Sequence, residues 1–116
     1  MKNDKVLLRA IIERCDNIEE CINFFGNDEE DFLSNKIFQQ SCAFDILQIG
    51  EAVKSLSFEL INNHRDVDWK GIAGYRDIIA HVYEKVQMHD QWITITEEIP
   101  ELKEACKRIL DEMDQK

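Results

Sequence analysis

The spacing of apolar residues predicts an amphipathic helix over residues 4–25. Its apolar positions recur at the short intervals that place side chains on one face of a helix; they are Leu7, Ile11, Ile18, Ile22 and Phe25. Gly26 is expected to end this helix, since glycine is common just beyond a helical C-terminus. Asn27 or Asp28 can then cap the element that follows.

A second apolar stretch, from Asp28 to about Asn62, predicts a central helix. Its apolar residues cover more than one face, which suits a helix that contacts several neighbours. Its length favours a bend or break near Ser34–Asn35 or near Gln40–Ser41. Gly50, within this stretch, suggests that another backbone approaches closely there.

The pattern after residue 62 predicts two more helices and short pieces. Asp68 is expected to cap a short helical turn, which Gly71 and Gly74 then interrupt, so that the next helix begins near Tyr75. Asp90 can cap a segment over residues 91–98. Pro100 fits the first turn of a last helix. One apolar edge marks that helix, formed by Leu102, Cys106, Ile109, Leu110 and Met113.

The totals agree with a single helical domain over residues 1–116. Hydrophobic residues at 44% and charged residues at 33%, with four Gly and one Pro, describe a folded chain rich in helix. We therefore expect an all-α fold, an up-and-down bundle of about four main helices with short helical pieces.

The formal charge of −10 limits the partners of the chain. It repels nucleic acids and acidic membranes over distances comparable to a Debye length, so any contact with RNA must be local. No apolar run approaches the roughly 18 residues of a membrane span, and charges interrupt the start of the chain before a signal peptide could form. We expect a cytoplasmic protein with no membrane partner.

The cysteines suggest neither a metal site nor a redox motif. They form no CxxC pair and have no nearby His at zinc-ligand spacing. Small buried core residues are the expected role for all four, which are Cys15, Cys21, Cys42 and Cys106.

The segment Gly74–Tyr83 carries polar residues that packing does not explain. At about 100° per residue, a helix here has a core stripe formed by Tyr75, Ile78, Ile79, Val82 and Val86. Arg76 and Tyr83 then share one flank of the stripe, and Asp77 and His81 share the other.

Two consequences follow from this arrangement. Asp77 can accept a hydrogen bond from His81, which fixes the imidazole tautomer and favours its protonated form. Arg76 and His81 lie about 140° apart, so they meet one substrate only if Arg76 reaches across or a second copy supplies the missing half. Ala80, which is small and faces outward, would let a second copy approach in a two-fold dimer.

The polar set resembles a known motif. Arg76, His81 and Tyr83 form the pattern R-x4-H-x-Y, which resembles that of HepT-like proteins, a branch of the HEPN superfamily found as toxins in prokaryotic toxin–antitoxin pairs. Asp77 stands where many members of the superfamily carry Asn. Three further stretches resemble landmarks of the family, so the resemblance covers nearly the whole chain: IGEA at 49–52, DW at 68–69 and IPEL at 99–102.

The resemblance implies a metal-independent endoribonuclease that acts as a homodimer and needs no cofactor. Arg76 would bind the scissile phosphate, and His81 would act as general acid or base on the ribose 2′-OH or the leaving 5′-oxygen. Asp77 would support His81. Tyr83 would be modified with AMP by a cognate nucleotidyltransferase antitoxin, and the added charge and bulk would exclude RNA.

Other interpretations of the same residues stay open. Arg76 and His81 can be ordinary surface residues paired with carboxylates, and Tyr83 can simply pack beside the core. At the level of function, the rival is a non-catalytic helical subunit that docks a nucleotidyltransferase and presents substrate or nucleotide to it. A structural helical dimer is the third reading. A ribonuclease would need local positive charge, for which the candidates are Lys2, Lys5, Arg9, Arg14, Lys54, Lys70, Arg76 and Lys85.

Overall fold

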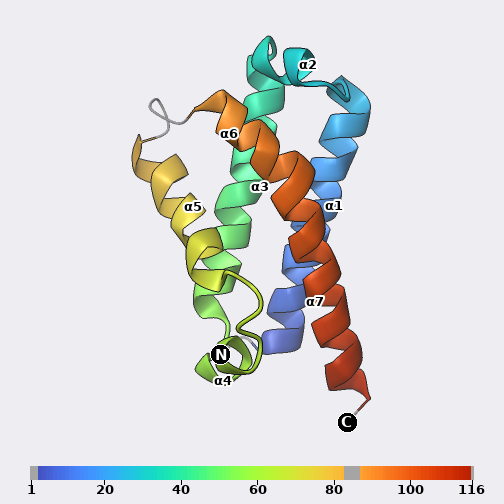
Figure 1. The fold of residues 1–116 in the computed structure, drawn as a ribbon, viewed down its shortest axis with the longest axis vertical. Coiled ribbons are helices and arrows are strands. Elements are labelled where there is room, and N and C mark those ends of the chain that lie inside the picture. Colours follow the sequence, from blue (N-terminus) through green and yellow to red (C-terminus); the bar gives the residue numbers. More distant parts are fainter. Residues whose placement is uncertain (1–2, 83–86, 116) are drawn as a thin grey trace.

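The computed structural model of the chain describes residues 3–82 and 87–115. Its long helices lie side by side in Figure 1, with a short helix across one end. In chain order the elements are α1 (Asp4–Phe25), α2 (Glu29–Leu33), α3 (Lys36–Ser55), α4 (Phe58–Asn63), α5 (Trp69–Val82), α6 (Met88–Ile93), a π-helix (Thr94–Glu98) and α7 (Ile99–Asp114). The expected all-α bundle of four main helices with short pieces is confirmed.

Helix α1 begins and ends where the sequence predicts. The Asn3 side chain accepts a hydrogen bond of 2.9 Å from the amide of Val6, which satisfies one of the free donors at the helix start. Gly26 ends the helix with φ at +143°, a backbone conformation that other residues rarely adopt. Asp28 then caps α2, because its carboxylate accepts from the amide of Asp31 at 3.0 Å.

The break between α2 and α3 falls at Ser34–Asn35, one of the two predicted places. The Asn35 side chain accepts from the amide of Phe38 at 3.1 Å and so caps α3. Gln39 donates its amide to the carbonyl of Phe32 at 2.9 Å, which satisfies a carbonyl at the end of α2. Local polar side chains therefore replace the backbone bonds that the break removes.

The sequence pattern did not reveal the end of α3. The helix stops at Ser55, and a separate short helix, α4, starts at Phe58. Ser57 caps α4 and is itself held by α1, because its amide and hydroxyl donate to the Asp4 carboxylate at 2.9 Å and 2.6 Å. A contact between residues 53 positions apart fixes this boundary.

Helices α6 and α7 form one continuous rod, although the sequence predicted two separate elements. Asp90 lies in the first turn of α6 and does not cap a new segment. The rod runs past Pro100, which cannot donate a backbone hydrogen bond and whose ring crowds the carbonyl four residues back. The π-helix precedes it, and there the amide of Ile99 reaches the carbonyl of Thr94. We attribute the wide turn to Pro100, since a π-turn lets a helix continue through an irregularity.

The core lies between α1, α3 and α7, and aromatic rings close its α2 end. Trp69 is buried as predicted, with 4% of its surface exposed. Trp92, also expected in the core, packs its ring against those of Phe32 and Phe38 at centroid distances of 5.6 and 6.3 Å. Gly50 is buried in α3. Within residues 3–82 and 87–115, no helix has the length and apolar character needed to cross a membrane.

Candidate functional site

Helix α5 carries Arg76 and His81 of the predicted motif and begins six residues earlier than the sequence suggested, at Trp69. Its first turn is capped by Asp68, whose carboxylate accepts from the amide of Gly71 at 3.1 Å. The buried Trp69 ring donates through Nε1 to the carbonyl of His64 at 2.9 Å. Burial of a large side chain contributes about 1.5–3 kcal/mol, which is comparable with the roughly 2 kcal/mol that two helical glycines cost together. Gly71 and Gly74 therefore do not interrupt the helix.

The predicted site residues fall at the C-terminal half of this helix. Arg76, Asp77 and His81 belong to α5, whose backbone is helical through Val82. Five helical steps separate Arg76 from His81, which corresponds to about 140° around the axis. Tyr83 lies outside the described residues. The side-chain roles of all four residues stay predictions.

The first residue of the predicted core stripe, Tyr75, connects α5 to the π-helix. It is partly buried against the core, and its hydroxyl donates a hydrogen bond to the Glu98 carboxylate. Thr94 donates its hydroxyl to the same carboxylate oxygen at 3.0 Å. Burial raises the pKa of Tyr75 to about 12, and the bond to Glu98 adds to this, so the phenol stays a donor at neutral pH. The sequence pattern did not single out Glu98, because its partner Tyr75 lies 23 residues away.

An acidic cavity of about 510 Å³ lies beside Tyr75, between the start of α5 and α7. Five carboxylates line it, contributed by Asp66, Asp68, Glu98, Glu101 and Glu104. The lining also contains one cation, Arg108, which is paired with Asp66 at 2.7 Å. Phosphate groups are repelled by such a lining, so this cavity is unsuited to hold RNA.

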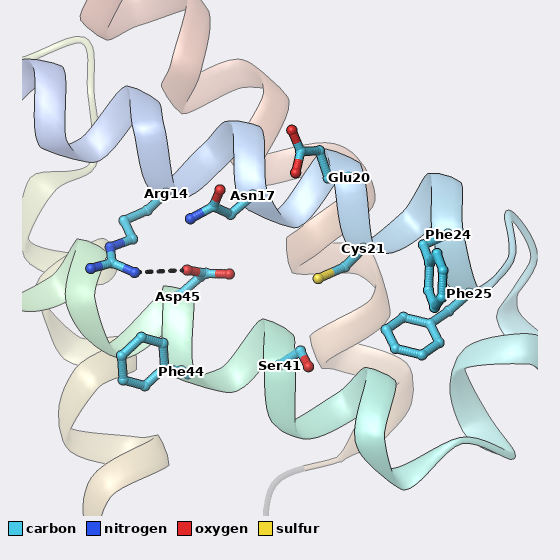
Figure 2. A pocket seen from close by; sticks show the side chains of 9 residues that line it. All are labelled: Arg14, Asn17, Glu20, Cys21, Phe24, Phe25, Ser41, Phe44 and Asp45. Carbon is cyan, nitrogen blue, oxygen red and sulfur yellow. Dashed lines mark hydrogen bonds and ion pairs between the residues drawn. The ribbon is translucent and has the colours of Figure 1, made fainter.

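A second hollow lies on a different side of the bundle, between α1 and α3. This open groove has a volume of about 740 Å³. In Figure 2, Arg14 is directed at Asp45, and the rings of Phe24 and Phe44 lie beside the hollow. The guanidinium of Arg14 lies 3.3 Å from Asp45 and 5.3 Å from the centre of the Phe44 ring. Nothing in the sequence pattern singled out this groove.

Arg14 and Lys5, which the sequence offered as cations for an RNA site, form ion pairs with carboxylates of other helices. Arg14 pairs with Asp45 of α3, and Lys5 pairs with Asp114 of α7 at 2.9 Å. Each bond to a carboxylate lowers the positive charge that the side chain can offer to a phosphate. Arg14 and Lys5 are therefore poor candidates for a contact with a phosphate.

The cysteines are free thiols, and three of them are buried as predicted. Cys21 is the exception, because it is half-buried and lines the groove between α1 and α3. Among the residues that the structure describes, no three side chains of His, Cys, Asp or Glu are arranged to hold a metal ion. Metal-independent cleavage stays a prediction.

The comparisons with known proteins confirm the family resemblance seen in the sequence. The family model described as ribonuclease HepT-like matches residues 11–109. A protein of Caldanaerobacter subterraneus named "Putative RNase" is 37% identical over 110 residues, which are 95% of this chain and 96% of that protein. A protein of Thermococcus cleftensis named "Probable ribonuclease HepT" is 35% identical over 80 residues, which are 69% of this chain and 73% of that protein.

A third relative contains a similar sequence within a longer chain. The Methanocaldococcus jannaschii protein named "Gamma-glutamylcyclotransferase and putative RNase" is 34% identical over 97% of this chain and 50% of its own length. No solved structure matches the chain. The helical bundle and these matches define a protein of the HEPN superfamily. Within that superfamily, the chain belongs to the HepT-like ribonuclease family.

Proposed function

We propose that this protein is a metal-independent endoribonuclease and the toxin of a prokaryotic toxin–antitoxin pair. The observation that carries the proposal is the presence of Arg76 and His81 on one continuous helix, inside the span that matches the ribonuclease HepT-like model. Relatives named as ribonucleases align along nearly the whole chain and support the same activity here. Because the proposed substrate is RNA, we also propose that the protein acts in the cytoplasm.

The proposed reaction is an internal transesterification. The ribose 2′-oxygen loses its proton and attacks the adjacent phosphorus, the bond from phosphorus to the 5′-oxygen breaks, and the leaving 5′-oxygen gains a proton. His81 either accepts the proton of the 2′-OH or delivers the proton to the 5′-oxygen, and solvent makes the other transfer, since a near-neutral pKa suits an imidazole to both tasks. Arg76 donates hydrogen bonds to the phosphate oxygens as their charge grows. The products are a 2′,3′-cyclic phosphate and a 5′-hydroxyl.

Asp77 is proposed to support His81 and not to touch RNA. It precedes His81 by four residues on a helix, the separation at which side chains meet on one face. A carboxylate that accepts from one imidazole nitrogen fixes which nitrogen carries the proton. The other nitrogen is then free to exchange a proton with the substrate.

A homodimer is part of the proposal. A separation of about 140° between Arg76 and His81 makes a complete site easier to form from two helices than from one. A two-fold axis beside α5 would bring Arg76 of one protomer toward His81 of the other, and Ala80 leaves space for that approach. A protein that stays monomeric at working concentrations would contradict this part.

The partner in the proposed pair is a nucleotidyltransferase antitoxin, which transfers AMP to Tyr83. The phenol oxygen attacks the α-phosphorus of ATP, pyrophosphate leaves, and the phenol proton goes to solvent. The adenylate adds a negative charge and a bulky group seven residues after Arg76. Repulsion and steric exclusion then keep RNA from the site.

A non-catalytic binding subunit is the second candidate, and the charge of the chain favours it. The formal charge is −10, and five carboxylates line the cavity beside Tyr75. A subunit that docks a nucleotidyltransferase would need no RNA contact, so this acidity would carry no penalty.

The deciding experiment is RNA cleavage by the pure protein in EDTA. We expect the wild type to release 2′,3′-cyclic phosphate ends, and Arg76→Ala and His81→Ala each to lose at least about 100-fold in rate. Matched controls are Arg108→Ala on α7 and His89→Ala on α6; Arg108 is exposed and pairs with Asp66 at 2.7 Å, and His89 is exposed and bonds Glu29 at 2.7 Å. Cleavage that survives both site variants would overturn the proposal. A wild type that binds the nucleotidyltransferase but cuts no RNA would favour the binding subunit.

A further inference from the structure

The π-helix and α5 are joined by one acidic side chain. Glu98 is the last residue of the π-helix, and one oxygen of its carboxylate accepts from both Tyr75 and Thr94. Thr94 also donates to the carbonyl of Asp90 at 3.1 Å, so its hydroxyl is shared between Glu98 and the backbone of α6. Thr94, in the same π-helix, therefore holds the Glu98 carboxylate in place while that carboxylate accepts the hydrogen bond from Tyr75 of α5.

Tyr75 is the point at which α5 is fixed to the α6–α7 rod. Over the part of α5 whose side chains the structure describes, residues 69–75, no other side chain hydrogen-bonds to that rod. The bond has a charged acceptor, which makes it stronger than a bond between neutral groups. Its donor is a rigid ring, half-buried and packed against the core. A bond of this kind restricts both rotation and sliding of the helix.

The position of this bond matters because Tyr75 immediately precedes Arg76. Rotation of α5 about its axis would move Arg76 and His81 together, since both project from the same helix. Proton transfer and phosphate contacts depend on atomic position, and a displacement of about 1 Å can cost about 100-fold in rate. The π-helix matters as well, since its wide turn places Glu98 opposite Tyr75.

We propose that Glu98 is a positioning residue for the ribonuclease site, and that it acts by holding the Tyr75 hydroxyl and thereby the rotation of α5. This inference rests on the proposed function. Glu98 itself contacts neither phosphate nor ribose in this scheme. Its carboxylate accepts the hydrogen bond from Tyr75 and does not interact with RNA in this scheme.

The test compares four variants by steady-state RNA cleavage. Tyr75→Phe and Glu98→Ala each remove the bond, and we expect kcat to fall roughly 10- to 100-fold with KM within about twofold. Glu98→Gln retains an oxygen that accepts the same hydrogen bond, so it should keep most of the activity. Thr96→Val is the matched control, because it removes a hydroxyl of the same π-helix that, among the described residues, bonds only the carbonyl of Trp92, at 2.8 Å.

Hydrogen exchange supplies a readout that does not depend on activity. In Tyr75→Phe we expect faster amide exchange across α5, with α1 unchanged and Thr96→Val like the wild type. An active wild type whose Tyr75→Phe and Glu98→Ala variants keep full kcat would overturn the positioning role and leave the proposed function intact. An inactive wild type would overturn the proposed function, and unchanged exchange in α5 would then also overturn the anchoring.

Discussion

The guanidinium of Arg14 donates a hydrogen bond to the carboxylate of Asp45 across 3.3 Å and so joins α1 to α3. The Asp45 side chain is only 7% exposed, whereas that of Arg14 is 34% exposed. Burial raises the pKa of Asp45, and the bond and charge of Arg14 oppose that rise. The bond to Arg14 therefore favours the ionised form of the Asp45 carboxylate, although that carboxylate is nearly buried.

Removal of Arg14 should destabilise the protein more at neutral than at acidic pH. The folded-state pKa of Asp45 lies above its unfolded value, so the native state binds more protons and loses stability as pH rises between the two values. Arg14→Ala raises the folded pKa further. We expect a loss of about 1–3 kcal/mol in the free energy of unfolding at pH 7, and clearly less near pH 4.

Urea denaturation at the two pH values measures this difference. Arg14→Lys keeps the positive charge and should lose less than Arg14→Ala. Lys107→Ala removes an exposed pair with Glu104 and should change stability by less than about 0.5 kcal/mol at either pH. An Arg14→Ala variant with the same loss at both pH values would contradict the assignment.

Two glycine-to-alanine changes should have opposite effects on stability. Gly26 has φ at +143°, and a Cβ placed on it would lie 2.1 Å from a carboxylate oxygen of Asp31. Gly26→Ala should therefore destabilise the protein by about 1–3 kcal/mol. A Cβ on Gly74 meets nothing within 4 Å, so Gly74→Ala in α5 should stabilise by about 0.5–1 kcal/mol. Thermal denaturation of both variants is the measurement, and shifts of the same sign would be inconsistent with this geometry.

The cysteines should react with iodoacetamide in a fixed order. Burial raises the pKa of Cys15 and of Cys106 to about 12 and shields both thiols, and it raises the pKa of Cys42 as well. Cys21 is half-buried at the edge of the groove, so it should be alkylated first in the folded protein. Peptide mass mapping at pH 8 follows the reaction, and Cys21→Ser should remove the fast phase. Equal rates at Cys21 and Cys106 would show that the groove assignment is wrong.

AMP transfer should modify Tyr83 and stop RNA cleavage. The chain contains two tyrosines, and the other, Tyr75, is half-buried with its hydroxyl bonded to Glu98. Incubation with the nucleotidyltransferase and ATP should add one AMP, which peptide mapping should locate at Tyr83. Tyr83→Phe should keep its cleavage activity and resist inhibition. AMP found at Tyr75, or an unmodified chain whose activity is lost, would refute this mode of neutralisation.

The parts of the fold that depend on neighbours in the chain could be predicted from the sequence. Helix α1 and the break at Ser34–Asn35 follow from apolar periodicity, a glycine stop and polar caps, which act within a few residues. The family motif could be recognised for the same reason, since Arg76 and His81 stand close together in the sequence.

Tertiary contacts decided the rest. The contact of Ser57 with Asp4 fixes where α3 ends, and the burial of Trp69 carries α5 through two glycines. The α6–α7 rod continues through Pro100 because the π-turn before Pro100 lets the helix accommodate the proline. The bonds from Arg14 to Asp45 and from Tyr75 to Glu98 join residues 31 and 23 positions apart. Short-range patterns carry no information about such pairs, because packing alone determines which distant side chains meet.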